Sequence, residues 1–240
     1  MDKREDWIMT SNSMDKPIIV FDVNDTLLDI DVLEPLFRRV FNAEHAMREW
    51  FAQLILYSEA LTLAGAYIPF GELGSGVLRM LGQAKRVDVT DADLDELRSL
   101  LQAMPAHPDV PDALRRLHEA GFRLVTLTNS APQPGFSPLE RAGIASFFER
   151  QFSVDAVRRY KPAQETYRMV ARELGVETPA LLLVAAHTWD TLGAQQAGCL
   201  AALVARSGNA PLPLPAVPMP DVIGPDMTVV AEQIIWLRDG

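Results

Sequence analysis

The chain is poor in cysteine: Cys199 is the only one among its 240 residues. An intramolecular disulfide is therefore excluded, and we expect a reducing, cytoplasmic setting. The sequence also lacks an apolar run of about 18 residues, the length that a membrane helix needs, so we expect no membrane partner. Residues 1–16 carry acidic side chains and no apolar stretch, unlike a secretory signal, and we expect them to form a loose leader.

Positive charge is scarce as well. There are 22 Lys and Arg against 32 Asp and Glu, which gives a formal net charge of −10. This balance argues against nucleic acid as a partner, because binding phosphate backbones needs clustered Lys and Arg. An anionic substrate must instead be met by a local positive site. With 48% hydrophobic residues, the chain is long enough for one well-packed domain with a smaller one attached.

Short apolar runs recur along the chain, and helical patterns separate them. The runs, which are typical of strands buried on both faces, cover Pro17–Phe21, Phe122–Leu127, Leu181–Ala186 and Leu200–Ala205. The helical patterns, each closed by a glycine, cover Val110–Ala120, Pro138–Ala142 and Gln164–Leu174. A last short strand and a last helix are expected near 221–223 and 227–237. This alternation predicts an α/β fold with a doubly wound, Rossmann-like parallel sheet.

Residues 29–104 break this alternation because they contain no strand pattern. Their leucines recur at helical spacing, and Thr90–Asp93 resembles the capping box at the start of a helix. We therefore predict an all-helical cap over residues 29–104. It would be inserted into a core domain formed by residues 17–28 and 105–240.

Side chains that can do chemistry follow the ends of the predicted strands. They are Asp22 and Thr26 after the first, Thr128 and Asn129 after the second, Lys161 before the third, and His187 and Asp190 after it. Because ligands bind at the carboxyl edge of an open parallel sheet, we expect these residues to converge. A carboxylate can attack as a nucleophile and form an ester, and a nearby lysine keeps it ionised. We predict that Asp22 is this nucleophile, beside Lys161, with Thr26 holding it. Asp25 and Asp29 are expected to serve the turn.

Four segments resemble, in order and spacing, the signatures of the haloacid dehalogenase superfamily: Phe21–Leu27, Thr128–Ser130, Tyr160–Pro162 and Trp189–Asp190. Most members of that superfamily are magnesium-dependent phosphatases, in which an Asp two residues after the nucleophile protonates the leaving alcohol. Asn24 stands there in this chain, and an amide cannot transfer that proton. Ala186 stands where the phosphatases have a carboxylate that binds the metal. We therefore expect neither a metal nor a cofactor.

The chain looks most like the type II L-2-haloacid dehalogenases, which need no metal. The resemblance implies that Asp22 displaces halide from C2 of a small 2-haloacid with inversion. Water, oriented by Asp190 beside Lys161, would then free the 2-hydroxy acid. Thr128 and Asn129 would bind the substrate carboxylate, while the cap excludes water. The other substrate contacts that we expect are Asn24, Phe51, Tyr57, Tyr167 and Trp189. A homodimer is also implied.

The chain departs from that family at several positions. Matching Tyr57 to the cap tyrosine of the family places Phe51 where the halide-binding arginine should be, and Arg48 lies one turn earlier. A serine and an asparagine after the third strand become Ala185 and His187. His187 is then a halide donor, a base that activates water, or a structural residue. The alternatives to dehalogenation are hydrolysis of another small acid, a phosphatase, and a binding module without turnover.

Overall fold

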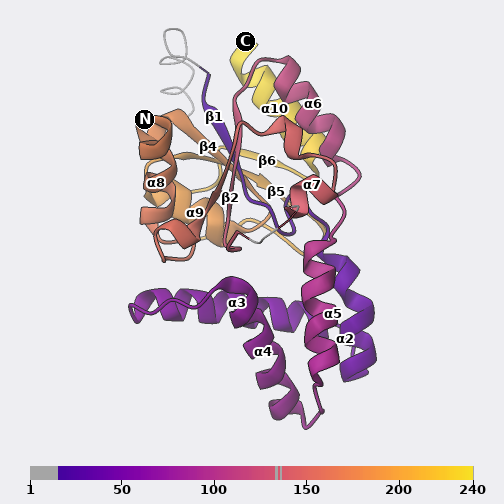
Figure 1. Cartoon of the computed structure of the whole chain (residues 1–240). Coiled ribbons are helices and arrows are strands. Elements are labelled where there is room, and N and C mark those ends of the chain that lie inside the picture. Colours follow the sequence, from indigo (N-terminus) through magenta and orange to yellow (C-terminus); the bar gives the residue numbers. More distant parts are fainter. Residues whose placement is uncertain (1–15, 133–134, 136, 240) are drawn as a thin grey trace.

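The structure is a computed structural model that describes residues 16–132, 135 and 137–239. All of the predicted leader except Lys16 lies outside these residues. Figure 1 shows a sheet flanked by helices, with a separate group of helices, α2 to α5, below one edge of the sheet. Within the described ranges, none of the helices has the length and apolar character needed to cross a membrane.

The core is a six-stranded sheet in the order β3-β2-β1-β4-β5-β6, and each neighbouring pair is parallel. The strands, in chain order, are β1 Ile18–Phe21, β2 Leu124–Thr128, β3 Arg150–Ser153, β4 Leu181–Ala185, β5 Leu200–Val204 and β6 Val222–Gly224. From β1, the strands β2 and β3 are added on one side and β4, β5 and β6 on the other. In such a sheet a ligand crevice lies between the carboxyl ends of β1 and β4. The prediction of a doubly wound parallel sheet is confirmed.

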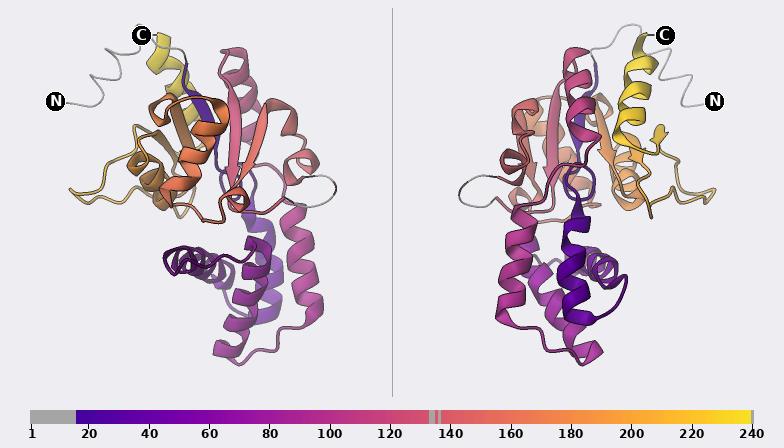
Figure 2. Two further views of the ribbon diagram at one scale, coloured as in Figure 1. Left: turned by 60° about the vertical axis from the view of Figure 1, so that its left-hand side comes forward. Right: turned by 90° about the vertical axis from the view of Figure 1, so that its right-hand side faces the viewer.

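Helices cover both faces of this sheet, with α6 and α10 packed together on one face and α8 and α9 on the other (Figures 1 and 2). The core helices are α6 Val110–Glu119, α7 Pro138–Arg141, α8 Gln164–Leu174, α9 Thr188–Gln196 and α10 Met227–Asp239. Single 3₁₀ turns lie at Ala145–Phe147, Val154–Ala156 and Thr178–Ala180.

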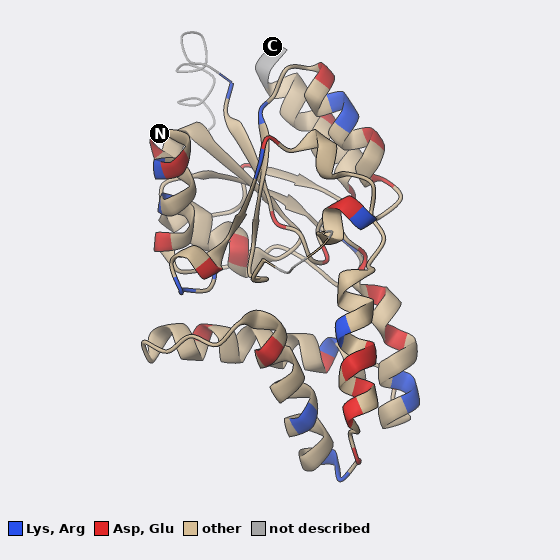
Figure 3. Cartoon of the chain, in the orientation of Figure 1, with Lys and Arg blue, Asp and Glu red and all other residues tan. Residues whose placement is uncertain are grey.

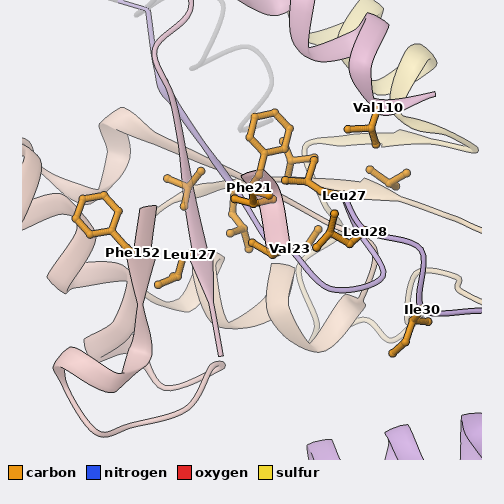
Figure 4. Close-up of a cluster of buried hydrophobic side chains, with 14 of the residues drawn as sticks. Phe21, Val23, Leu27, Leu28, Ile30, Val110, Leu127 and Phe152 are labelled. Carbon is orange, nitrogen blue, oxygen red and sulfur yellow. The ribbon is translucent and has the colours of Figure 1, made fainter. Parts of the chain in front are cut away.

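The hydrophobic core lies where β1 and β2 meet the helices. Figure 4 shows the side chains of Phe21, Leu27 and Leu127 gathered around these strands, with Val110 reaching them from the start of α6. All four side chains are fully buried. Burying apolar area of this size contributes about 1.5–3 kcal/mol per side chain, so the strand that carries Asp22 is firmly held.

The cap consists of helices alone. Its elements are the 3₁₀ turn η1 Ile30–Leu33, α2 Glu34–Phe41, α3 Ala46–Leu63, α4 Phe70–Lys85 and α5 Asp91–Gln102. Thr90 and Asp93 form the predicted capping box at the start of α5. Where α3 crosses α4, the Trp50 Nε1 donates to the carbonyl of Gly74 at 2.9 Å. A Cβ on Gly74 would lie 3.2 Å from the Trp50 ring, so glycine permits this close crossing.

Two adjacent chain segments connect the cap to the core. The amide of Asp29 donates to the carbonyl of Pro105 at 2.8 Å, and the amide of His107 donates to that of Leu27 at 3.0 Å. Between these bonds, Leu28 forms an antiparallel bridge with Ala106. The entry to the cap and the exit from it are thus paired as a short two-stranded connection.

The sequence analysis missed β3 and α9. β3 lies at the edge of the sheet, and the exposed Arg150 and Gln151 interrupt its apolar pattern. α9 is rich in polar and small residues, so its sequence shows little helical periodicity. Both elements matter for the site, because α9 carries Asp190 and the chain runs from β3 to Lys161.

Candidate active site

Asp22 follows β1 directly, and both of its carboxylate oxygens are held. The Thr26 hydroxyl donates to Oδ2 at 2.7 Å, and the Lys161 ammonium donates to Oδ1 at 2.7 Å. Thr26 is itself fixed, because its oxygen accepts from the amide of Ala186 at 2.8 Å. The Asp22 side chain is 8% exposed. The predicted association of Asp22, Thr26 and Lys161 is thus present in the structure, with the carboxylate oriented at the edge of the sheet.

Lys161 is fully buried, and its ammonium group lies between two carboxylates. Its Nζ donates to Asp22 Oδ1, to Asp190 Oδ2 at 2.6 Å and to the carbonyl of Leu127 at 3.2 Å. Its backbone amide donates to Asn129 Oδ1 at 3.1 Å. Burial disfavours the charged amine, but the two carboxylates outweigh it and raise the pKa of Lys161 above its usual value. The group therefore stays cationic at neutral pH.

Asp190, on α9, is also fully buried and shares the ammonium of Lys161. Burial raises the pKa of Asp190 above its usual value, although Lys161 and the hydroxyl of Tyr167 both act to lower it. The Tyr167 hydroxyl donates to Asp190 Oδ1 at 2.6 Å. The sequence analysis expects Tyr167 to contact substrate, but the structure does not place it at the cleft: its side chain is buried and positions Asp190.

A close approach of α9 to the Lys161 segment keeps these groups together. A Cβ on Gly193 would lie 2.5 Å from Pro162 Cβ, 2.7 Å from the Pro162 carbonyl oxygen and 2.7 Å from the Tyr167 hydroxyl. These distances are shorter than any real Cβ contact, so no larger residue fits there without movement of the chain. Gly193 therefore sets how near α9 lies to the lysine.

The donor set does not fit a magnesium ion. The carboxylates of Asp22 and Asp190 both accept hydrogen bonds from the ammonium of Lys161, which lies where a cation bridging them would have to bind. Asn24 and Ala186 supply no carboxylate, and Mg²⁺ is usually held by one or two of them. In the described part of the chain, no group of three His, Cys, Asp or Glu side chains is placed to hold a metal ion.

His187 belongs to a second polar cluster that the sequence analysis did not foresee. Its Nε2 lies 3.2 Å from Asp25 Oδ2, and Arg48 Nη1 lies 3.3 Å from the same oxygen. Burial acts to raise the pKa of Asp25, but the hydrogen bond with His187 and the neighbouring positive charges lower it below its usual value. Asp25 thus does more than serve the turn, and Arg48 binds Asp25 and Asp31 rather than Asp22.

The imidazole of His187 lies between two aromatic rings. The ring centroid of Phe51 is 5.3 Å from that of His187, and the centroid of Trp189 is 5.6 Å away on a nearly parallel plane. Trp189 also lies near Lys161, whose Nζ is 5.7 Å from its ring centroid. The Nδ1 of His187 is buried without a hydrogen-bond partner among the described residues. One buried ring nitrogen therefore remains for a ligand.

A cleft of about 900 Å³ between cap and core opens beside the site. Asn24, Thr128 and Phe51, which we expect to bind substrate, line it. Ser130, which was not singled out, also lines it: its hydroxyl lies 3.5 Å from Asn24 Nδ2, and its amide donates to Thr128 Oγ1 at 3.1 Å. Its place directly after Asn129 was the signal that could have identified it.

The structure does not place Tyr57 at the cleft, although the sequence analysis expects it to contact substrate. It is 39% exposed on α3 and absent from the lining of the cleft. The buried face of α3 is formed by residues such as Phe51, Leu54 and Ser58. Tyr57 precedes Ser58 by one residue and so lies about 100° round the helix from that face.

Comparison with known proteins gives a consistent result. Residues 17–198 match the family model of the haloacid dehalogenase-like hydrolases. The chain is 27% identical over 193 residues to the (S)-2-haloacid dehalogenase of Pseudomonas sp. (strain YL), which covers 80% of this chain and 83% of that protein. It is 26% identical over 194 residues to haloacetate dehalogenase H-2 of Moraxella sp. (strain B), covering 80% and 87%.

Solved structures share the fold. A crystal structure of an L-2-haloacid dehalogenase superposes with a TM-score of 0.84 at 27% identity, covering 95% of this chain and 100% of that one. The L-2-haloacid dehalogenase from Xanthobacter autotrophicus, with chloropropionic acid covalently bound, gives 0.81 at 23% identity over 92% and 98%. Because the family model matches more than half of its length, the chain belongs to the haloacid dehalogenase-like hydrolase family and is a hydrolytic enzyme.

Proposed function

We propose that this enzyme is a metal-independent dehalogenase of 2-haloacids. An Asp22 oxygen attacks C2 and inverts it, the carbon–halogen bond breaks, halide leaves, and an ester joins Asp22 to the acid. Water then attacks the Asp22 carbonyl carbon and releases the 2-hydroxy acid, while Asp190 takes the proton. The observation that carries this proposal is the Lys161 ammonium, which bridges Asp22 and Asp190 at 2.7 and 2.6 Å.

We assign roles to the polar groups around Asp22 from their contacts. Thr26 and Lys161 each donate a hydrogen bond to its carboxylate and so orient it for attack. We assign the substrate carboxylate to Thr128, Asn129 and Ser130. Thr128 ends β2, the other two follow it directly, and Thr128 and Ser130 line the cleft. The relative from Xanthobacter autotrophicus, which binds chloropropionic acid covalently, is an example of a covalent intermediate on this fold.

His187 is the group that we assign to the departing halide. Its Nε2 is bound to Asp25, so Nδ1 is the nitrogen available to a ligand, and the apolar rings of Phe51 and Trp189 flank it. Because Nε2–H is directed at Asp25, Nδ1 carries an N–H only in the imidazolium form, and we assign that form to the departing halide. An N–H beside aromatic rings stabilises a leaving anion, since the charge develops where little water competes. On this proposal, His187 and Trp189 take the place of the arginine that Phe51 replaces.

Substitution of the nucleophile tests the reaction. Wild-type enzyme should release halide from L-2-chloropropionate or chloroacetate equally with and without EDTA, and Asp22→Asn should release none. A single turnover in heavy-oxygen water should label the peptide that contains Asp22, because water attacks its carbonyl carbon. An unlabelled peptide rules out the ester, and activity that appears only with magnesium on a phosphate ester points to a phosphatase.

The loss of the halide-binding arginine at Phe51 favours a second candidate, hydrolysis of another small organic acid at the same site. Release of no halide from any haloacid, together with an Asp22-dependent hydrolysis of an acyl substrate, identifies that case. Two further expectations remain proposals. We propose that the enzyme works in the cytoplasm, where the buried free thiol of Cys199 stays reduced, and that it forms a homodimer. Light scattering of the purified chain tests the second.

A further inference from the structure

The cleft between cap and core is much larger than a haloacid of two or three carbons. Its volume of about 900 Å³ equals that of roughly thirty water molecules, each of which takes about 30 Å³ in the liquid. A cleft of this size is typical of sites for drug-sized ligands. A small acid bound at Asp22 would leave most of it to water.

The cleft has a polar end near Asp22, which Asn24, Thr128 and Ser130 form. Apolar side chains from both the cap and the core make up much of the remaining lining, among them Phe51, Leu54, Ile68, Phe70, Leu139 and Phe152. Polar side chains such as Glu72, Arg98 and Gln151 also line it. Binding of an apolar group to such a surface is favourable, because the group displaces water from it. The lining therefore fits an acid whose carboxylate lies at the polar end and whose remaining atoms are apolar.

Two glycines of α4 leave additional room. Gly71 and Gly76 both line the cleft, and a Cβ added to either would meet no atom within 4 Å. Glycine weakens a helix relative to alanine, so neither position gains helix stability from it. Gly74 permits the contact with Trp50, but no neighbouring atom lies close enough to Gly71 or Gly76 to require glycine there.

We propose that the preferred substrates carry a large apolar substituent on C2, either an alkyl chain of about four carbons or an arylmethyl group. The substituent would extend from Asn24 and Thr128 along the apolar part of the cleft, between Phe70 of the cap and Phe152 of the core. This inference rests on the proposed function, because it takes the acid to be bound at Asp22.

Binding of acids without halogen tests the inference separately from turnover. Calorimetry would compare propionate with hexanoate and 3-phenylpropionate on the wild-type enzyme. Each buried methylene is worth about a fourfold gain in affinity, so hexanoate should bind at least about tenfold more tightly than propionate, and 3-phenylpropionate likewise. Equal dissociation constants for the three acids would overturn the inference.

Filling the cleft provides the second arm. Gly71→Phe and Gly76→Phe should each reduce the preference for hexanoate over propionate at least about tenfold, because the new ring takes the space of the chain. Ala84→Phe is the matched control: Ala84 is exposed on the same helix and does not line the cleft, so the preference should stay unchanged. Thermal melting shows whether each variant folds. If one of the two glycine variants does not fold, the other one tests the inference. A preference that survives in the folded variants overturns the inference.

Halide release separates the two proposals. L-2-chlorohexanoate should give a kcat/KM at least about tenfold above that of L-2-chloropropionate. Release from the shorter acid with no gain for the longer one refutes the large substituent and leaves the dehalogenase in place. Release from neither refutes the dehalogenase, and the calorimetry still decides which acids the cleft binds.

Discussion

At the scale of single residues, the chemistry depends on Lys161. Its ammonium is the positive charge that Asp22 and Asp190 share, and it has no exposure to solvent. Two carboxylates this close repel each other strongly when buried, and a cation between them removes the repulsion. An ion pair of this kind adds little net stability compared with apolar packing, but loss of one partner leaves an uncompensated charge.

Removal of the lysine ammonium should therefore affect both activity and stability. Lys161→Met should abolish turnover and lower the free energy of unfolding by about 3–5 kcal/mol at pH 7. The loss should be smaller at pH 5, because burial raises the pKa of Asp190, and its carboxyl can then take up a proton and relieve the repulsion. Urea denaturation at both pH values measures this. Lys85→Met, which breaks an exposed pair with Glu49, is the control and should cost less than about 1 kcal/mol. An equal loss at the two pH values contradicts the account.

The hydroxyl of Tyr167 should set the acid limb of the pH–rate profile. It donates to the ionised Asp190, and this bond acts to lower the pKa of that carboxyl. Tyr167→Phe removes the bond, so the pKa of Asp190 should rise and the acid limb of kcat should move to higher pH. Tyr67→Phe loses a comparable bond to Asp155, away from Asp190, and should leave the limb in place. An unmoved limb in the Tyr167 variant shows that Asp190 is not the base.

At the scale of the elements, packing brings together residues that are distant in the sequence. The buried strands and their polar ends were predictable, because an apolar run that ends in Asp22 or Thr128 is visible in the sequence. The bond from Tyr167 to Asp190 was not, since it depends on how α8 lies against α9. The contact of His187 with Asp25 was not predictable either, because it too depends on how distant parts of the chain pack together.

The contact of α9 with the lysine segment can be tested through Gly193. Gly193→Ala places a methyl group within 2.7 Å of the Pro162 carbonyl oxygen, so α9 must move away. We expect the free energy of unfolding to fall by about 1–3 kcal/mol and kcat to fall at least about tenfold, because Asp190 moves with the helix. Gly76→Ala meets no atom and should stabilise the fold by about 0.5–1 kcal/mol. A folded Gly193→Ala enzyme with normal kcat would show that this spacing does not matter.

At the scale of the whole molecule, the anionic substrate that we propose would approach a negatively charged protein. The net charge is −10, and Figure 3 shows acidic residues, in red, along α5 and elsewhere on the cap. The positive charge of Lys161 is buried and already shared by two carboxylates. The long-range field therefore opposes binding, while short-range hydrogen bonds favour it.

Added salt should consequently raise kcat/KM. Raising the ionic strength from about 10 to about 300 mM shortens the range of charge interactions from about 30 Å to less than about 8 Å. We expect kcat/KM for a haloacid to rise a few fold while kcat stays nearly constant. Sodium sulfate is the suitable salt, because it adds no halide product. A fall in kcat/KM would show that attraction to local positive groups dominates the approach.

The paired connection at Leu28 and Ala106 has a broader consequence. The chain leaves the core and returns to it at neighbouring positions, so the whole cap is inserted in the way that a hairpin turn would be. The core, which carries Asp22, and the cap, which forms most of the apolar lining of the cleft, can therefore diverge independently. New substrate ranges can arise by exchange of one inserted segment, with the chemical machinery inherited intact.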